Sequence, residues 1–411
     1  MASHPVSPLA PAKFPDMPPI PGVRFAATAA GIRYKDRNDL LLAELAPGTT
    51  VGGVFTRNKM PGAPVDWCRA ILRRGTARGL VVNAGNANVF TGKAGAVATR
   101  ESAKAAAKAI GCDSQDVYLA STGVIGQPLP HEKIVAAMPA LYADLKADAV
   151  ELAARTIMTT DTFPKGSRAT AKLDGKTVTV AGFCKGSGMI QPDMATMLCF
   201  VFTDAKLPPK VLQALLAPSS DASFNCMTVD GDTSTSDTVL LFATGQVAHK
   251  PVARANDPRL NSFRKALDTV LRDLAIQVAR DGEGASKFMS VTIKGAANDV
   301  AARRIAFTVA NSPLVKTAIA GEDANWGRVV MAVGRAGEKA NRDRLKIWMG
   351  GVLIARNGAV DPKYDEAAVM PHMKGQEIDI VVDVGIGKGK ATVWSCDLTH
   401  GYIDINGSYR S

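Results

Sequence analysis

The sequence predicts a mixed α/β protein built from more than one domain. Short apolar runs of β type alternate with segments in which apolar residues recur with helical periodicity. The chain has 411 residues, which is longer than one typical domain, so we expect two or three domains. Hydrophobic residues make up 46% of the chain and charged residues 21%, a composition typical of globular proteins.

The chain divides into an N-terminal arm and two domains. Residues 1–22 are rich in proline and lack an apolar core segment, which favours an extended arm over a secretory signal. The pattern of elements changes near Lys287, so we expect a larger domain over residues 23–286 and a smaller one over residues 287–411. No apolar run reaches the ~18 residues that a membrane span needs, and we expect no membrane partner.

The strand predictions rest on apolar runs bounded by turn residues. The run from Met197 to Phe202 is apolar throughout, which is typical of a strand buried on both faces. Gly385 to Lys390 predicts a hairpin turn between two strands near the C-terminus. The other strands that we expect are, in chain order, residues 25–34, 39–46, 50–56, 79–83, 117–120, 176–181, 224–229, 238–243 and 288–295.

The helix predictions rest on periodicity and on signals at the helix ends. An alanine-rich helix over residues 99–110 is expected to end at Gly111, a favourable residue just past a helix end. A helix over residues 208–216 carries prolines in its first turn, where they are tolerated. Ser312-Pro313 is a typical helix start. Further helices are expected over residues 131–145, 148–158 and 262–280 and from Asp299 onward.

The net charge of +11 and the sequence pI near 9.4 raise the question of a nucleic-acid partner. The lysines and arginines are scattered, and the basic stretches Arg69 to Arg78 and Arg335 to Lys346 lack interleaved aromatic residues. We therefore interpret the charge as a solvated basic surface with mild attraction for anionic substrates, and we expect no nucleic-acid partner.

Neither a metal site nor a disulfide framework is predicted. The six cysteines form no close pair, and the five histidines have no metal-ligand spacing. Asp230 to Thr233 lacks the regular alternation and the closing glutamate of a calcium loop, so we interpret it as structural. Such cysteine usage suits a reducing cytoplasm, which is where we expect the protein to be located.

Ala195-Thr196 is the candidate for nucleophilic chemistry. It stands directly before the predicted central strand, after a glycine-rich run at Gly186 to Gly188. A threonine hydroxyl is a weak nucleophile, and one known solution uses the threonine's own α-amine as the base, freed by cutting the preceding peptide bond. Such an amine titrates near pH ~7.7–8, so it accepts a proton at neutral pH. The residues alone favour ordinary strand sequence, because threonine is a common β former.

Lys185 to Phe200, KGSGMIQPDMATMLCF, resembles the self-cleavage motif of the ornithine acetyltransferase family, the bifunctional glutamate N-acetyltransferases of arginine biosynthesis. The family pattern is a Lys-Gly-Ser/Ala-Gly-Met run leading to Met-Ala-Thr-Met-Leu, which residues 185–189 and 194–198 match. NAGNAN at residues 83–88 resembles a second signature, although by itself it indicates only a tight turn. The resemblance covers nearly the whole chain, from about residue 22 to residue 411.

The resemblance implies a layered α/β sandwich as the catalytic domain, residues 23–286, with the smaller α/β domain contributing its tail to the active site. It implies cleavage between Ala195 and Thr196, after which Thr196 is the nucleophile. Ser121-Thr122-Gly123 follows a predicted strand and resembles the family's oxyanion-hole segment, with the Thr122 hydroxyl and the Gly123 N–H as donors. The substrate-binding residues that it implies are Thr159, Lys185, Thr196, Glu283, Asn406 and Ser411.

Within these, Lys185 would bind the substrate's α-carboxylate and Glu283 an ammonium group. The implied reaction moves the acetyl group of N2-acetyl-L-ornithine to L-glutamate by ping-pong chemistry through an acetylated Thr196, without cofactor or metal. Members of the family divide on whether acetyl-CoA also serves as donor, and no residue in this sequence decides it. The implied assembly is a dimer of αβ pairs.

Two other functions remain open on the residues. A relative with the same nucleophile could be an aminopeptidase or amidase that passes the acyl group to water; matched charges at Lys185 and Glu283 favour an amino-acid acetyl donor instead. An anion- or nucleic-acid-binding protein would have an uncut chain and strongly salt-dependent binding.

Overall fold

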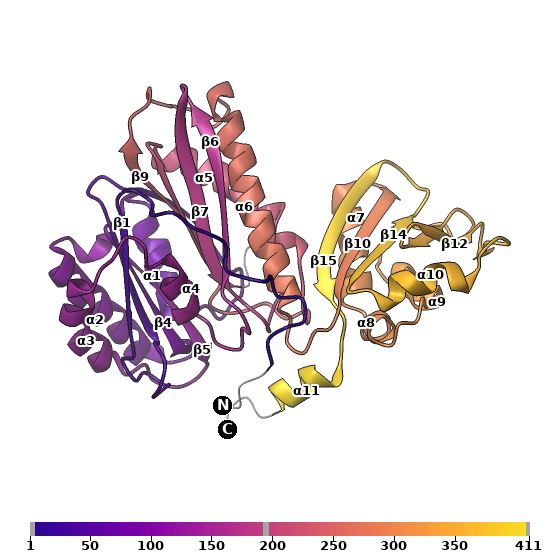
Figure 1. Ribbon diagram of the computed structural model, residues 1–411, viewed down its shortest axis with the longest axis horizontal. Coiled ribbons are helices and arrows are strands. Elements are labelled where there is room, and N and C mark those ends of the chain that lie inside the picture. Colours follow the sequence, from indigo (N-terminus) through magenta and orange to yellow (C-terminus); the bar gives the residue numbers. More distant parts are fainter. Residues whose placement is uncertain (1–4, 192–196, 408–411) are drawn as a thin grey trace.

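The computed structural model describes residues 5–191 and 197–407. Two sheets lie face to face, and helices cover both outer faces, so that four layers form a sandwich (Figure 1). Among the described residues the first sheet contains β1 (Val23–Thr28), β2 (Leu40–Leu45), β4 (Gly79–Asn86) and β5 (Val117–Val124), in the order β1-β2-β4-β5. The second contains β3 (Thr50–Phe55), β9 (Thr238–Val247), β8 (Leu198–Ala205), β7 (Lys176–Lys185) and β6 (Lys165–Leu173), in the order β3-β9-β8-β7-β6.

The space between the two sheets is filled by aromatic and aliphatic side chains. Phe202 of β8 stacks on Phe242 of β9 with ring centroids 5.4 Å apart, and Phe25 of β1 packs edge-on against Phe202. Such ring pairs add to the stabilisation from area burial. Helices α1 (Ala63–Leu72) and α4 (Val150–Thr156) add apolar residues to the same cluster. The layered sandwich and the mixed α/β class agree with the prediction.

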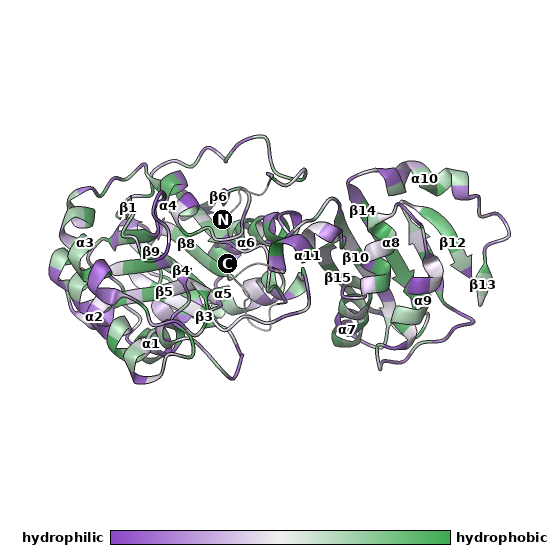
Figure 2. Ribbon diagram, turned by 90° about the horizontal axis from the view of Figure 1, so that it is seen from below, coloured by the Kyte–Doolittle hydropathy of each residue, from purple (hydrophilic) through white to green (hydrophobic). Residues whose placement is uncertain are grey.

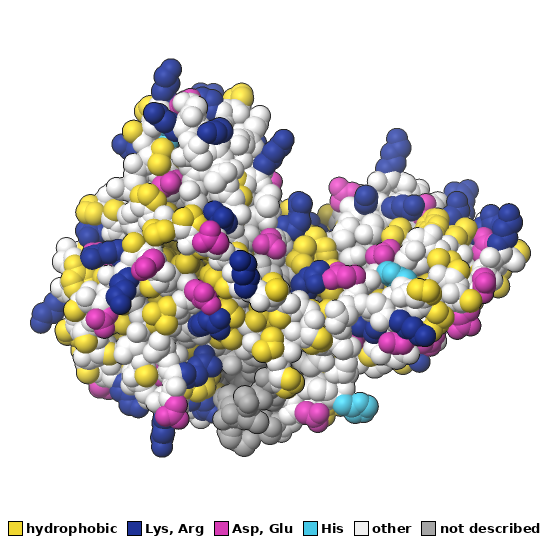
Figure 3. Space-filling view, viewed as in Figure 1, with side chains coloured by type: hydrophobic (Ala, Val, Ile, Leu, Met, Phe, Trp, Pro, Cys, Tyr) yellow, Lys and Arg dark blue, Asp and Glu magenta, His cyan; other side chains and the backbone are white. Residues whose placement is uncertain are grey.

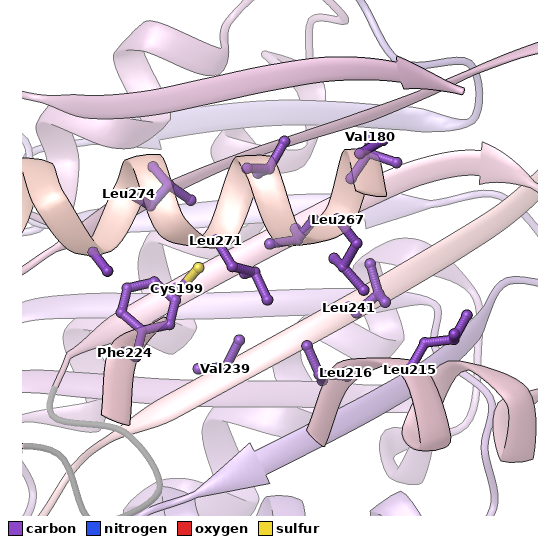
Figure 4. Close-up of a cluster of buried hydrophobic side chains, with 14 of the residues drawn as sticks. Val180, Cys199, Leu215, Leu216, Phe224, Val239, Leu241, Leu267, Leu271 and Leu274 are labelled. Atoms are coloured by element: carbon purple, nitrogen blue, oxygen red, sulfur yellow. The ribbon is translucent and has the colours of Figure 1, made fainter. Parts of the chain in front are cut away.

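Each outer face is covered by a pair of helices. Helices α2 (Gly92–Ile110) and α3 (His131–Ala143) pack on the first sheet, and α5 (Pro209–Asp221) and α6 (Asn261–Arg280) pack on the second. Leu267 and Leu271 of α6 face Val239 and Leu241 of β9 (Figure 4). These contacts hold β9 and its neighbour β8 rigidly from outside.

Strand β8 is the predicted central strand. It pairs in parallel with β9 and antiparallel with β7, and all of its residues are buried. The prediction of a strand buried on both faces is confirmed, with the strand beginning at Leu198 and continuing to Ala205. The candidate cleavage site, Ala195-Thr196, falls outside the described residues, as does Ser411.

The C-terminal part has its own sheet and its own core. The described strands are β10 (Phe288–Ala296), β11 (Lys346–Met349), β12 (Val352–Arg356), β13 (Ala359–Val360), β14 (Glu377–Asp383) and β15 (Gly389–Cys396), in the order β13-β12-β11-β14-β10-β15. They pack with helices α7 (Asp299–Ala310), α8 (Pro313–Ala320), α9 (Trp326–Gly334) and α10 (Glu366–Lys374). A short helix, α11 (His400–Asn406), then turns back between this part and the sandwich (Figures 1 and 2).

Two predicted elements are wrong. Residues 224–229, predicted as a strand, form a 3₁₀ turn at Phe224–Cys226 and a single bridge from Met227 to Trp394. A short apolar run cannot distinguish these conformations, because both bury Phe224 and Met227. Residues 385–390 are not a hairpin turn, since β14 and β15 lie on opposite sides of β10.

The glycines of that connection have a packing reason. A Cβ on Gly389 would lie 2.2 Å from the backbone of Asn298, just beyond the end of β10. The connection therefore passes close over the end of β10, which only glycine permits.

Two of the predicted helix-end signals, Gly111 and Ser312, agree with the structure. Gly111 follows α2 with a positive φ of 76°, and the Ser312 side chain accepts a hydrogen bond from the Val315 N–H at the start of α8. Helix α2 itself begins earlier than predicted, at Gly92. None of the helices within residues 5–191 and 197–407 combines the length and the apolarity that crossing a bilayer requires.

Candidate active site

A cavity of about 260 Å³ lies where strand ends of the two sandwich sheets meet loops from both parts of the chain. It brings together six of the predicted site residues, namely Thr122, Gly123, Thr159, Lys185, Glu283 and Asn406. Further lining residues come from the loop before β9, Ser234 to Asp237. Segments that are distant in the sequence therefore form one site.

Thr122 and Gly123 directly precede the last residue of β5 and pair in parallel with Ala84 and Gly85 of β4. The strand predicted over residues 117–120 continues to Val124, because β4 extends in step with β5. Gly123 has a φ of 130°, and a Cβ there would lie 2.2 Å from the carbonyl carbon of Gly85. Both the positive φ and the close approach of the two strands therefore require glycine at this position. Without a side chain, the Gly123 N–H is accessible as a hydrogen-bond donor.

The NAGNAN segment connects these two strand ends. The Ser121 hydroxyl donates to Asn83 Oδ1 over 2.6 Å, and Asn83 Nδ2 donates to the Asn86 carbonyl over 2.8 Å. Asn86 Oδ1 in turn accepts from the Asn88 N–H over 2.8 Å. The asparagine side chains thus satisfy buried backbone groups beside Thr122 and Gly123. A tight turn alone would not require these side chains.

Lys185, at the end of β7, points its ammonium group at two threonine hydroxyls. Its Nζ lies 3.1 Å from Thr122 Oγ1 and 2.7 Å from Thr159 Oγ1. An ammonium group is a donor only, so both hydroxyl oxygens accept. Burial lowers the pKa of Lys185 below its ordinary value, and the nearby Asp161 carboxylate partly offsets this effect.

The glycine-rich loop after Lys185 is fixed by side chains from elsewhere. The Met189 and Ile190 N–H groups donate to the Asp230 carboxylate over 2.6 and 2.9 Å. Met189 has a positive φ of 56°, a strained conformation that these bonds help to hold. Asp230 therefore holds the loop in place by hydrogen bonds, in agreement with the structural interpretation of Asp230 to Thr233. Within the described part of the chain no cluster of His, Cys, Asp and Glu could hold a metal ion.

Glu283 also lines the cavity. Its carboxylate lies so close to Gly188 that a Cβ there would be 2.2 Å from Glu283 Oε2. Asn406 Nδ2 donates to the same oxygen over 2.7 Å. Burial raises the pKa of Glu283, and hydrogen bonds from Thr160 and Asn406 partly offset this shift.

Helix α11 brings Asn406 to the Glu283 carboxylate. Gly284, with a φ of 71°, lies against Gly401, since a Cβ on Gly284 would be 2.5 Å from the Gly401 carbonyl carbon. The Thr399 hydroxyl donates to the Gly284 carbonyl over 2.6 Å, and the Tyr402 hydroxyl donates to Asp230 over 3.3 Å. The C-terminal helix is thus docked by glycine contact and by two hydrogen bonds.

Residues that precede and follow the candidate cleavage site in the sequence line the cavity. Ile190 and Met197 both contribute to its wall. The Met197 carbonyl accepts from the Thr238 N–H over 2.9 Å, which registers the start of β8 against β9. Ala195, Thr196 and Ser411 lie outside the described residues, so their predicted roles stay predictions.

The sequence did not single out Asp161 or Asp237. Asp161 follows the predicted site residue Thr159 by two positions, and Asp237 ends the loop before β9; both side chains are buried. A charged residue between polar neighbours is normally exposed. The signal that marks them is burial, which only the fold provides.

Three comparisons relate the chain to known proteins. The profile of the ArgJ family matches residues 24–411. The chain is 59% identical over 407 residues to the arginine biosynthesis bifunctional protein ArgJ of Gluconobacter oxydans, covering 99% of this chain and 96% of that protein. It is 58% identical over 412 residues to the protein of the same name from Bradyrhizobium diazoefficiens, covering 100% of both.

Solved structures give shorter matches. A crystal structure of the arginine biosynthesis bifunctional protein ArgJ from Bacillus halodurans is 39% identical, with a TM-score of 0.49, and covers 51% of this chain and 98% of that one. A crystal structure of an ornithine acetyltransferase complexed with ornithine, from Mycobacterium tuberculosis, is 32% identical, with a TM-score of 0.38, and covers 46% of this chain and 96% of that one.

Proposed function

The chain belongs to the ArgJ family, and from this we propose that the cavity is the active site of its acetyl transfer. The protein is an acetyltransferase of arginine biosynthesis that moves the acetyl group of N2-acetyl-L-ornithine to L-glutamate. The observation that supports the site best is that Met197, directly after the candidate nucleophile, lines the same cavity as Thr122, Gly123 and Lys185.

The first step is self-cleavage. The Thr196 hydroxyl oxygen attacks the carbonyl carbon of Ala195, and its proton passes to the Thr196 nitrogen as the peptide bond breaks. The resulting ester is hydrolysed by water, which leaves a carboxylate on Ala195 and a free α-amine on Thr196. The products are an α-chain, residues 1–195, and a β-chain, residues 196–411. The α-amine then serves as the base for turnover.

In turnover, the Thr196 hydroxyl attacks the acetyl carbonyl of N2-acetyl-L-ornithine. The Thr122 hydroxyl and the Gly123 N–H donate to the oxyanion that forms. The bond from the carbonyl carbon to nitrogen breaks, ornithine leaves with the proton that the α-amine received, and acetyl-Thr196 remains. The amine of L-glutamate then attacks this ester in a second passage through the same geometry, which gives ping-pong kinetics.

Substrate recognition uses two residues of opposite charge that line the cavity. Lys185 binds the α-carboxylate, and Glu283 binds the ammonium group of ornithine, with support from Thr159, Asn406 and Ser411. Two matched charges suit an amino-acid donor better than the neutral amides that an amidase would cleave. Removing the charge of Lys185 or of Glu283 would leave the substrate's carboxylate or ammonium group buried without a counter-ion. Both protein charges therefore contribute to affinity for the substrate.

The assembly, the additional donor and the location are proposals of the same kind. We expect a dimer of αβ pairs, and acetyl-CoA as an additional donor to glutamate is open. The reaction requires no cofactor. All six cysteines are free, which supports a reducing compartment such as the cytoplasm. On the face shown in Figure 3, basic and acidic side chains are interspersed, which supports small-molecule substrates over a nucleic acid.

The test is a two-step acetyl transfer with wild-type protein. Incubation with N2-acetyl-L-ornithine alone is expected to release ornithine and to add one acetyl group to the β-chain, observed by intact mass. After removal of the donor, L-glutamate is expected to discharge the β-chain and to yield N-acetyl-L-glutamate. Release of free acetate at the rate of ornithine formation would favour the amidase, and a β-chain that never gains an acetyl group would contradict the proposal.

A further inference from the structure

Beneath the cavity lies a fully buried cluster of one lysine and two carboxylates. Lys165 Nζ lies 2.7 Å from Asp161 Oδ1 and 2.5 Å from Asp281 Oδ2, and all three side chains are 0% exposed. Burying three charges is costly unless each is well paired, so such a cluster is weak evidence for stability alone. Its position beside Lys185 indicates another use.

Asp161 connects this cluster to the cavity wall. Its Oδ1 accepts from the Gly186 N–H over 2.6 Å, and its Oδ2 accepts from the Thr159 N–H over 3.0 Å. The same Oδ2 lies 3.8 Å from Lys185 Nζ, an ion pair beyond hydrogen-bonding distance. One carboxylate therefore fixes two backbone groups of the substrate site and faces its buried ammonium group.

The direction of the hydrogen bonds follows from this arrangement. A charged Lys185 can only donate, so the Thr122 oxygen accepts from it and the Thr122 proton is free to point elsewhere. A neutral Lys185 would have a lone pair that can accept that proton. The charge on Lys185 thus determines whether Thr122 donates to an oxyanion or to its own neighbour.

We propose that Asp161 is a positioning residue that keeps Lys185 charged and so directs the Thr122 hydroxyl proton into the cavity. Lys165 and Asp281 hold the Asp161 carboxylate in place. This inference rests on the proposed function, in which Thr122 is an oxyanion donor.

The charges around Lys185 support this assignment. Burial lowers the pKa of Lys185; the charge of Asp161 opposes the shift most, Lys165 adds to it, and Glu283 and Asp237 oppose it further. Burial alone would raise the pKa of Asp161, but the charges of Lys165 and Lys185 and its hydrogen bonds lower it well below its ordinary value. Asp161 is therefore ionised whenever the enzyme works, and it is the main charge that keeps Lys185 protonated.

The experiment compares pH profiles of kcat/KM for N2-acetyl-L-ornithine in wild type and in Asp161→Asn. The half-reaction is used because the acceptor amine takes no part in it. Activity that needs protonated Lys185 falls as pH rises through the pKa of Lys185, which forms the basic limb. Loss of the Asp161 charge is expected to move this limb about 1 to 3 pH units toward acid. The acid limb, set by the Thr196 α-amine, is expected to stay in place, so the loss of activity in the variant is greatest at high pH.

Asp281→Asn is the matched control. This variant removes the ion pair between Asp281 and Lys165, which belongs to the same buried cluster. The Asp281 carboxylate also accepts from the Thr162 N–H, but it does not contact Lys185. Asp281→Asn is expected to lower thermal stability about as much as Asp161→Asn, with a much smaller displacement of the basic limb. An Asp161→Asn limb that coincides with wild type, with activity reduced equally at every pH, would overturn the inference, and so would an equal displacement in Asp281→Asn.

A second comparison covers the case in which Asp161→Asn does not fold. Asp161→Asn/Lys165→Met removes the buried charge and its counter-ion together, and it is compared with Lys165→Met. The limb of the double variant lies on the acid side of the single variant if Asp161 acts on Lys185, and the two coincide if it does not. Wild type that transfers no acetyl group at any pH would refute the proposed function itself, which is a distinguishable result.

Discussion

Asn406 Nδ2 donates a 2.7 Å hydrogen bond to Glu283 Oε2, across a sequence separation of 123 residues. This bond joins the last helix of the chain to the loop that follows α6. An amide neighbour can donate to a carboxylate without adding charge, so Glu283 keeps its negative charge for a substrate ammonium group. The bond thus makes the C-terminal helix part of the cavity in which we propose that the substrate binds.

Thr196→Ala is expected to leave the chain uncut. The wild type is expected to give two fragments that meet at Ala195 and Thr196, because the hydroxyl that starts the acyl shift is present only in the wild type. Denaturing intact mass of both proteins measures this directly. A single 43.1 kDa chain from active, folded wild type would contradict the mechanism.

Thr122→Val is expected to lower kcat by roughly 100- to 1,000-fold, the usual cost of removing one oxyanion donor. Valine keeps the shape and removes the hydroxyl, so KM for the donor should change little. Thr122→Ser retains the donor and serves as the control. Steady-state kinetics of the two variants, with circular dichroism to verify folding, separates loss of the hydroxyl from loss of structure.

Gly188→Ala is expected to raise KM for N2-acetyl-L-ornithine while the protein stays folded. The new Cβ would lie 2.2 Å from Glu283 Oε2, so the carboxylate must move out of its position. Gly334→Ala is the matched control, since a Cβ there meets nothing within 4 Å. If both variants bind the donor as well as wild type, Glu283 is not the ammonium ligand.

Glu283→Gln is expected to weaken ornithine binding by about 1.5–3 kcal/mol, the value of a hydrogen bond to a charged group. Burial raises the pKa of Glu283. As the pH is lowered, the wild-type affinity for ornithine should therefore begin to fall at a higher pH than it would with a glutamate of ordinary pKa. Below that pKa Glu283 is neutral, and the variant should match wild type there. Calorimetric titration with L-ornithine across this range tests the sign, because it does not depend on the α-amine that turnover needs.

Much of the fold and part of the site follow from the sequence. The apolar run from Met197 onward predicts β8 correctly, because a strand buried on both faces is apolar at every position of its core. The site residues that the structure describes were predicted from motif resemblance, and five of them lie on loops or strand ends that periodicity alone would not single out. Residues 224–229 were predicted wrongly because a run that short has no distinguishable period.

The buried cluster beneath the cavity could not be predicted. Lys165 meets Asp281 across 116 residues, and only packing of β6 against α6 brings them together. Each residue by itself is of a type normally found on the surface, so nothing in the sequence predicts three charges in the interior. Long-range burial of polar groups is decided by tertiary structure.

The order of strands in the second sheet also determines what becomes of the two chains after cleavage. The α-chain would keep β3, β6 and β7, and the β-chain β8 and β9, yet β9 pairs with β3 and β8 pairs with β7. In this sheet the strands of each fragment are thus interleaved with strands of the other, and neither fragment retains the second sheet complete. Separating them means breaking backbone ladders inside a hydrophobic core, so the pair behaves as a complemented fold and not as a reversible complex that dilution can dissociate.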